Sequence, residues 1–453
     1  MANKVWLGGA AAIPQVSTLT VTGTWVAAET ITLKVGASGA EKEILITVGT
    51  DIAVADIAEI IRRTWGGDSL KNDESRNQTG NNVGEYSRIT ATSSAGVVTL
   101  TADDAGVPFT LAVTVSSTSG SIATATPTAA TGPHHFSNTA NWVGNAIPVD
   151  LGPPPGIVDS ITFDHRAVSS MKYDMSQGAI DVLDLIITND FVHDIGLPEI
   201  NRSNPALPYD EYFDTYFTIG MQDAGSVLQV GVGDGQGSGR IKIDTGADQC
   251  VIRIDATGSR AETNVPAILL LGTNTSTDID IESGDVGLAF FDDEVLSAND
   301  INVSFRENRS SDSTVVLGSG VTVIGDVNFD GGVINTYCAL GTVNMNGAEL
   351  IFQNSRLNVS RAMTTLNLRR GIVRYASNGV LATLNLSSQG TIDFRRGIGS
   401  ITVTDANVYA ASSFFDPDDR VTWTNGIDLI NCTWSDLGEF ETPIHKTWKI
   451  SAV

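Results

Sequence analysis

Carboxylates are the side chains of this sequence that could do chemistry, because two of them facing one groove can cleave a glycosidic bond. That reaction needs two carboxyl groups about 5 to 9.5 Å apart. Asp393 and Glu349 fall on nearby coils of a sequence repeat and are one possible pair. Arg374 falls between them in the same column, which favours a surface charge ladder. We therefore predict no catalytic residue and no enzyme, with a glycan hydrolase or lyase as the alternative.

Three other patterns resemble ligand sites, and each lacks a necessary part. The acidic segments 278–282 and 292–294 offer oxygen ligands for a divalent cation, but neither spacing matches a known loop. The glycine-rich segment 231–239 lacks the lysine and the helix of a phosphate-binding loop, which favours a turn between strands. His134 and His135 lie in a predicted linker and are expected to be exposed and inert. We predict no metal ligand and no cofactor.

The composition indicates β structure in a strongly acidic protein. Among 453 residues, 17% are charged and 45 are Gly, which suits strands and tight turns. A formal net charge of −25 repels phosphate backbones, so no nucleic-acid partner is expected. The sequence has neither an apolar run of membrane-spanning length nor a secretion signal, which predicts no membrane contact and assembly in the cytoplasm. The cysteines Cys250, Cys338 and Cys432 are too few for a disulfide framework and are expected to be buried.

The elements that would position any site are indicated by a repeat toward the C-terminus. Five tripeptides place a polar residue between two apolar ones, as in a strand with one buried face. Second strands follow Gly347, Gly371 and Gly390, and they bring aromatic residues to positions 352, 375, 394 and 409. The tripeptides begin 16, 23, 18 and 17 residues apart, which is the length of a coil of two or three short strands. Coils of this length that stack in parallel would close one continuous core, so we predict a parallel β-helix. The five tripeptides are Val327-Asn328-Phe329, Val343-Asn344-Met345, Leu366-Asn367-Leu368, Leu384-Asn385-Leu386 and Ile401-Thr402-Val403.

Polar side chains of the repeat allow more than one interpretation. The Asn column at positions 328, 344, 367 and 385 is either a solvated strand face or a hydrogen-bonded ladder between stacked strands. Two Arg-Arg-Gly turns, 369–371 and 395–397, could contact an acidic neighbour, although a solvated turn is the simpler interpretation.

A smaller module is predicted before the repeat. A helix is indicated by Ile57, Ile60, Ile61 and Trp65, which share one face. The segment 116–132 is rich in Ser, Thr, Ala and Gly and is expected to be a linker or an edge hairpin. Further on, Trp142 could seal the end of the β-helix. Strands are expected around 17–21, 29–35, 42–48, 87–92, 97–101 and 109–115.

The predicted fold is mainly β, with a small α+β or β-sandwich domain followed by a parallel β-helix. The expected parts are an N-terminal arm at 1–16, a β-rich anchoring domain with one helix at 17–130, a linker and cap at 131–165, the β-helix at 166–434, and a C-terminal tail at 435–453.

Three stretches resemble a known class of proteins. The segment 19–25, continued through 57–60, resembles the small β-domains of tailed-bacteriophage virion proteins. Asn141-Trp142-Val143-Gly144-Asn145-Ala146-Ile147-Pro148 resembles the opening found before parallel β-helices in phage structural proteins and bacterial surface proteins. Together with the segment 237–243, most of the chain resembles phage virion structural proteins that join an anchoring domain to a β-helix. The resemblance implies that the β-helix is trimeric.

This resemblance implies a non-enzymatic structural role in the virion, after assembly in the host cytoplasm. We expect a homotrimeric capsid decoration or head fibre, attached through the N-terminal region to the major capsid protein or, as the second choice, to tail proteins. The alternative is a tail fibre or tailspike that binds or depolymerises a host surface glycan. A bacterial surface adhesin is a third interpretation.

Overall fold

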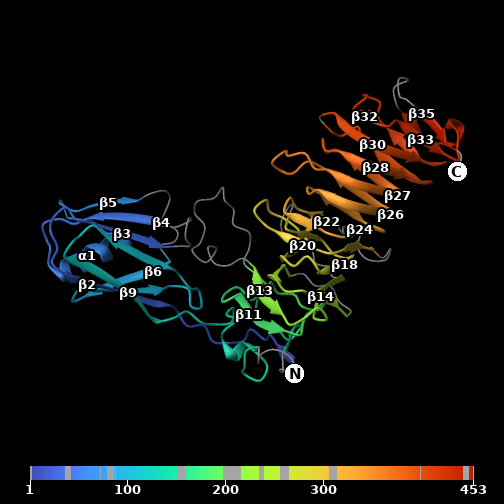
Figure 1. Ribbon diagram of the computed structural model, residues 1–453. Coiled ribbons are helices and arrows are strands. Elements are labelled where there is room, and N and C mark those ends of the chain that lie inside the picture. The colour runs from blue at the N-terminus through green and yellow to red at the C-terminus, as the bar shows by residue number, and fades with distance from the viewer. Residues whose placement is uncertain are drawn as a thin grey trace.

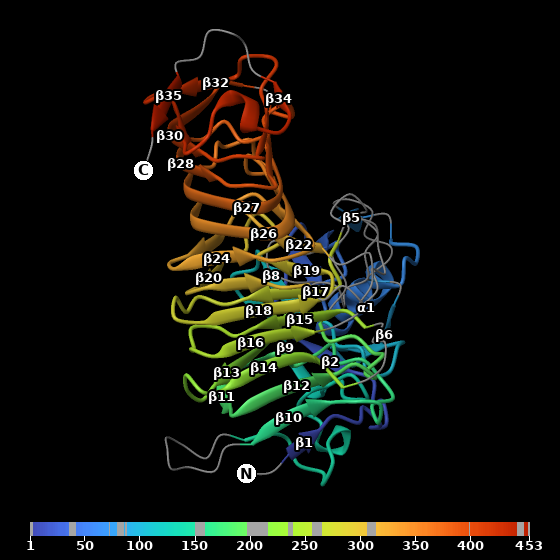
Figure 2. The same ribbon diagram turned by 90° about the vertical axis from the view of Figure 1, so that its right-hand side faces the viewer.

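The computed structural model shows a mainly β protein. It describes residues 3–35, 42–71, 73–78, 86, 88–149, 159–196, 216–233, 239–255, 265–305, 314–397, 399–441 and 448–451. An antiparallel module (blue in Figure 1) lies beside a long stack of parallel strands. Figure 2 shows these strands one above another from the N-terminal to the C-terminal end. The predicted mainly β class is therefore confirmed.

The module consists of two antiparallel sheets and one helix. One sheet has the order β6-β7-β2-β9 and the other β5-β4-β3-β8. Alternate residues of β2, β3 and β7 are buried, which is the pattern of strands with one face on a core. The elements are β2 (Val16–Gly23), β3 (Thr30–Val35), β4 (Lys42–Thr47), α1 (Val54–Trp65), β5 (Ser75–Gln78), β6 (Ile89–Ser94), β7 (Val97–Ala102), β8 (Leu111–Val115) and β9 (Gly120–Thr128).

Helix α1 forms where the sequence predicts it. Ile57, Ile60, Ile61 and Trp65 are all buried and pack into the core of the module. The first turn carries Asp56, whose charge favours the positive end of the helix dipole. The predicted helix face is confirmed.

The segment 116–132 differs from its prediction. Of the two predicted alternatives, a linker and an edge hairpin, the linker is wrong: the segment contains the nine-residue edge strand β9, which pairs antiparallel with β2 and not with β8. Its composition of Ser, Thr and Ala resembles that of a linker because β9 lies at the edge of its sheet, where few side chains need to be apolar. Strand β5, which the sequence pattern does not predict, pairs with β4.

The N-terminal arm contributes the first strand of the parallel sheet. Strand β1 (Asn3–Val5) pairs with β10 (Ser160–Phe163), so the whole antiparallel module is inserted between two paired strands. Trp6 is fully buried and meets Trp142 edge to face, with ring centroids 5.2 Å apart. The amide of Val143 donates to the carbonyl of Val5 and covers the outer edge of β1. Residues predicted to be an N-terminal arm and a cap therefore close one end of the core together.

The parallel strands form two stacks, because each strand typically pairs with the strand two further along the chain. The first stack contains β10, β12, β14, β16, β18, β21 and β24, and the second contains β11, β13, β15, β17, β19, β22 and β25. The 13-residue strands β26 and β27 belong to both. Bounds are β11 (Ser176–Val182), β12 (Asp184–Thr188), β13 (Phe217–Met221), β14 (Val227–Val232), β15 (Ile241–Asp244), β16 (Val251–Asp255), β17 (Ile268–Leu271), β18 (Asp278–Ser283), β19 (Val286–Leu288), β21 (Ile301–Val303), β22 (Thr314–Leu317), β24 (Asp326–Phe329), β25 (Val333–Thr336), β26 (Leu340–Phe352) and β27 (Met363–Tyr375).

The later strands continue both stacks to the end of the described chain. Strands β34 and β35 pair in parallel with β31 and β33, so the sheet extends into the region predicted to be a tail, 435–453. A separate pair, β20 (Leu296–Ala298) and β23 (Val321–Val323), is also parallel. The later strands are β28 (Leu381–Leu386), β29 (Gly390–Asp393), β30 (Ile401–Val408), β31 (Ser413–Phe415), β32 (Val421–Trp423), β33 (Ile427–Ile430), β34 (Phe440–Glu441) and β35 (Trp448–Ser451).

Four of the five predicted repeat lines are in register. Asn328, Asn344, Asn367 and Asn385 pair with one another in succession. The fifth line is wrong, because Asn385 pairs with Asn407, whereas the segment 401–403 pairs with 421–423. Strand β30 is eight residues long and contains both segments, so spacing alone selected the wrong half.

An aromatic column runs through the core of the second stack. Phe352, Tyr375 and Phe394 follow one another with ring centroids 4.9 and 5.7 Å apart, as their spacing predicts. The next ring is Phe414, 5.4 Å from Phe394, and not Tyr409, which is 39% exposed. The column shares one continuous hydrophobic core with Trp6 at the other end.

Candidate functional site

The predicted carboxylate pair is held by arginines. Glu349 accepts a hydrogen bond from Arg374, and Asp393 accepts hydrogen bonds from Arg395. Burial acts to raise the pKa of Asp393, but the contacts with Arg395 outweigh it and lower the pKa below its ordinary value. A general acid in glycoside hydrolysis needs a raised pKa. The pair is therefore built as a charge ladder, as the position of Arg374 indicates.

The two neighbouring histidines are not the exposed pair that the sequence predicts. His135 is only 2% exposed, and its ring nitrogens lie 3.0 Å from an Asp174 carboxylate oxygen and 2.9 Å from the carbonyl oxygen of Gly106. His134 contacts the carbonyl of Ser170, and burial lowers its pKa. Since the two rings bind different partners, they join chain segments and do not form a metal-binding pair.

The predicted acidic segments are also engaged in structural contacts. Asp278 and Asp280 accept hydrogen bonds from the side chains of Asn299 and Asn302. Burial raises the pKa of Glu294, whose carboxylate accepts hydrogen bonds from the hydroxyl of Tyr216 and the amide of Phe291. Among the described residues there is no group of three His, Cys, Asp or Glu side chains that could hold a metal ion.

The glycine-rich segment 231–239 is only partly described. Gly231 and Val232 end strand β14, and residues 234–238 lie outside the described part of the chain. The buried side chain of Asn189 donates to the carbonyls of Gly231 and Gly233 and so fixes the start of this segment.

The cysteines are buried, as the sequence predicts. Cys250, Cys338 and Cys432 are free thiols. Burial raises the pKa of Cys250 and that of Cys338 to about 11, so both are protonated at neutral pH.

The two Arg-Arg-Gly segments differ: 369–371 lies within strand β27 and is not the predicted turn, whereas 395–396 forms a turn. Arg370 donates to the side chain of Gln389, whereas the guanidinium of Arg395 lies over the ring of Phe415, 4.6 Å from its centroid. Because Arg395 also pairs with Asp393, it belongs to the charge ladder of the second stack.

A ladder of asparagine side chains is the most extended polar arrangement that the structure describes. Each side-chain amide donates to the side-chain oxygen of the residue below it, at 2.8 or 2.9 Å, from Asn407 down to Asp280. The ladder confirms the hydrogen-bonded interpretation of the column for the part that the sequence identified. We call this set the asparagine ladder; its members are Asn302, Asn328, Asn344, Asn367, Asn385 and Asn407, with Asp280 as the last acceptor.

A shallow depression lies at the Asp280 end of the asparagine ladder. Its volume is about 250 Å3. A register shift between Ile254 and Asp255 of β16 places Glu282 at a bulge, and bulges of this kind redirect side chains. The depression brings together the guanidinium of Arg253, the amide of Gln229 and the carboxylates of Asp280 and Glu282 on the outer face of the first stack. Its lining comprises Gln229, Arg253, Ile254, Asp255, Asp280, Glu282 and Ser304.

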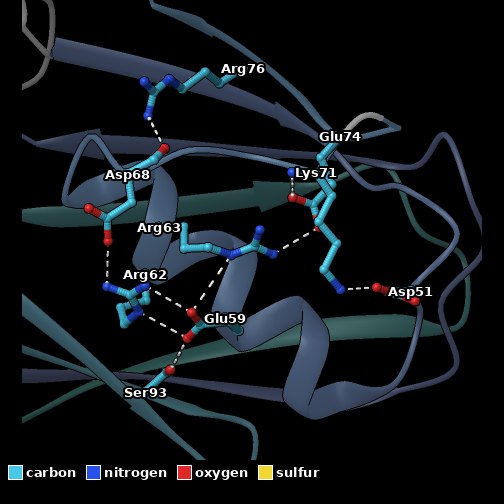
Figure 3. Close-up of polar contacts among 9 residues, drawn as sticks. All are labelled: Asp51, Glu59, Arg62, Arg63, Asp68, Lys71, Glu74, Arg76 and Ser93. Carbon is cyan, nitrogen blue, oxygen red and sulfur yellow. Dashed lines mark hydrogen bonds and ion pairs between the residues drawn. The ribbon is translucent and has the colours of Figure 1, made fainter.

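Helix α1 carries the densest set of ion pairs in the module (Figure 3). Glu59 contacts Arg62 and Arg63 and accepts a hydrogen bond from Ser93 of strand β6. The hydrogen bond from Arg62 is the main reason that the pKa of Glu59 is lowered to about 2. Arg63 continues the network to Glu74, which precedes β5. The network connects α1 to both sheets of the module, which indicates that its role is to hold the helix in place.

No protein-family model matches the sequence, and no curated protein matches it either. Within the described residues, no helix is both long enough and apolar enough to span a membrane.

Proposed function

We propose that the parallel sheet is a parallel β-helix and that the chain is a non-enzymatic structural protein of a tailed-phage virion. The N-terminal region attaches it to the particle, with the major capsid protein as the favoured partner and tail proteins as the second choice. The β-helix projects as a homotrimer and serves as a capsid decoration or head fibre.

The observation that carries this proposal is the single core that runs from Trp6 to Cys432 without a break. Strands two or three elements apart pair in parallel along most of this core, and the long strands β26 and β27 pair with each other in both stacks, which is the pairing expected of stacked coils. Outside the core, the asparagine ladder and the Glu349–Arg374 pair link the side chains of strands that are paired in the sheet. Both features favour an elongated shape over a reaction site.

Two measurements test the proposal. Mass spectrometry and electron microscopy of particles made by the genome that encodes this chain should detect it and place a rod on the capsid. Light scattering of the purified chain should give three chain masses. Absence from purified particles would contradict the virion role, whereas a monomer mass would contradict only the trimer.

A second candidate function is binding or depolymerisation of a host surface glycan. The depression at Arg253, Asp280 and Glu282 favours it, because donors and acceptors side by side suit sugar hydroxyl groups. Incubation of the protein with host capsule should then release new reducing ends, or retain the capsule on the protein. An Arg253→Ala variant with unchanged release or retention would contradict a role of this depression.

A further inference from the structure

Strand β9 ends its sheet, lies near β8 of the other sheet, and leaves most of both faces exposed. It is the last strand of the sheet β6-β7-β2-β9 and pairs with β2. The five residues from Ala123 to Pro127 are all exposed, on both faces of the strand. An edge strand of this kind presents unpaired backbone amides and carbonyls that can pair with another strand.

The edge also lacks the charges that normally prevent such pairing. No Asp, Glu, Lys or Arg occurs between Asp104 and Asp150, although charged residues make up 17% of the chain. This segment contains both β8 and β9, and β8 is the edge strand of the other sheet. One side of the module is therefore bounded by two uncharged edge strands.

The opposite edges of the same two sheets carry protection. Strand β5 contains Arg76 and follows Glu74, and Ser93 of β6 donates to Glu59 of helix α1. Figure 3 shows Glu74 paired with Arg63, Arg76 next to Asp68, and Glu59 facing Ser93. Charged side chains and covering helices are the usual means of blocking an edge. The contrast within one module indicates that the β9 edge is open for a partner.

We propose that β9 is a self-association site at which β9 of a second copy adds an antiparallel strand about a twofold axis. Two acidic chains repel each other, but this strand brings no carboxylate to the contact, and charges more than about 10 Å away are screened by salt. Small side chains such as Ala123 and Ala125 allow the backbones to approach. The register shift near Thr126 and the missing amide hydrogen of Pro127 confine pairing to the first part of the strand.

This site goes beyond the proposed virion function and does not depend on it. A β9 pair joins two modules, whereas the proposed trimer joins three β-helices. Both contacts together would give assemblies of six chains where all three β9 strands of one trimer pair with those of a second trimer, and β9 pairing alone would give two.

The test measures the mass of the full chain by light scattering and sedimentation over a range of concentrations. The double variant Ala123→Glu with Ala125→Glu places like charges opposite one another in the pair and should weaken association about tenfold or more. The matched control, Thr92→Glu with Ser94→Glu, adds the same charge to exposed positions of β6 and should associate like the wild type. Higher salt should strengthen association because it screens the net charge.

Either of two results would overturn the proposal. One is a wild-type mass that does not rise from one to two chains, or from three to six, with concentration. The other is an equal loss of association in the β9 variant and in the β6 control, which would assign the effect to net charge and not to the edge. Unchanged thermal unfolding of both variants verifies that the module remains folded.

Discussion

The asparagine ladder gives the sharpest prediction, at its central member Asn367. The side chain of Asn367 donates to Asn344 and accepts from Asn385, both at 2.8 Å. An Asn367→Ala variant loses two hydrogen bonds worth about 0.5–1.5 kcal/mol each. Because the side chain is only half-buried and water can replace part of the loss, we expect local destabilisation of about 1–2 kcal/mol.

An Asn367→Asp variant tests the direction of the hydrogen bonds. At pH 7 its carboxylate still accepts from Asn385 but faces the oxygen of Asn344, so an acceptor meets an acceptor. We expect a loss at least as large as for alanine. Protonation restores a donor, so the loss should shrink as the pH falls to about 4. The folded state favours the protonated form, which raises the pKa of this introduced group and places its stabilising effect at low pH.

The assay is hydrogen exchange of peptides from β26, β27 and β28, because it reports local opening. A loss of 1.4 kcal/mol corresponds to about tenfold faster exchange. The matched control is Asn335→Asp, a half-buried position on the second stack. Equal exchange in both variants, or an Asn367→Asp effect that does not change with pH, would refute the ladder as a stabilising element.

Three further predictions concern packing and charge. A Phe394→Ala variant opens the aromatic column at a fully buried position and should lower stability by about 3–5 kcal/mol, measured by calorimetry. A Gly120→Ala variant should lower the melting temperature of the module, because a Cβ there would lie 2.5 Å from the ring of Trp25. Glu59 contributes stability above its unfolded pKa of 4.5, and this is lost as the pH falls toward about 2. Because the Arg62 and Glu59 side chains are still 27% and 39% exposed and water screens the pair, Glu59→Gln should cost about 1 kcal/mol or less at pH 7. The urea midpoints of variant and wild type should converge near pH 2.

The sequence predicts the class of structure best where burial alternates in a fixed register. Four asparagines of the repeat identify their own pairing because the residues on either side of each must point into the core. The same logic fails at Asn407, since β30 offers two apolar alternations and only its partners distinguish them.

Edge strands and contacts between distant segments are harder to predict. Strand β9 has exposed residues on both faces, so it lacks the alternation that would reveal it. The burial of His135 depends on contacts with Gly106 and Asp174, which lie far from it along the chain. Local composition around His135 contains no sign of either contact.

Insertion of the antiparallel module between β1 and β10 means that two chain crossings join it to the β stack, and the bridge between Ile13 and Thr131 holds these crossings together. A protease that severed one crossing would leave the module attached by the other. Mechanical load on the module would likewise be shared by two covalent connections, and the first of them ends in the buried ring of Trp6. Detaching the module from the β stack therefore requires both connections to be broken, whereas a module at the end of a chain needs only one break.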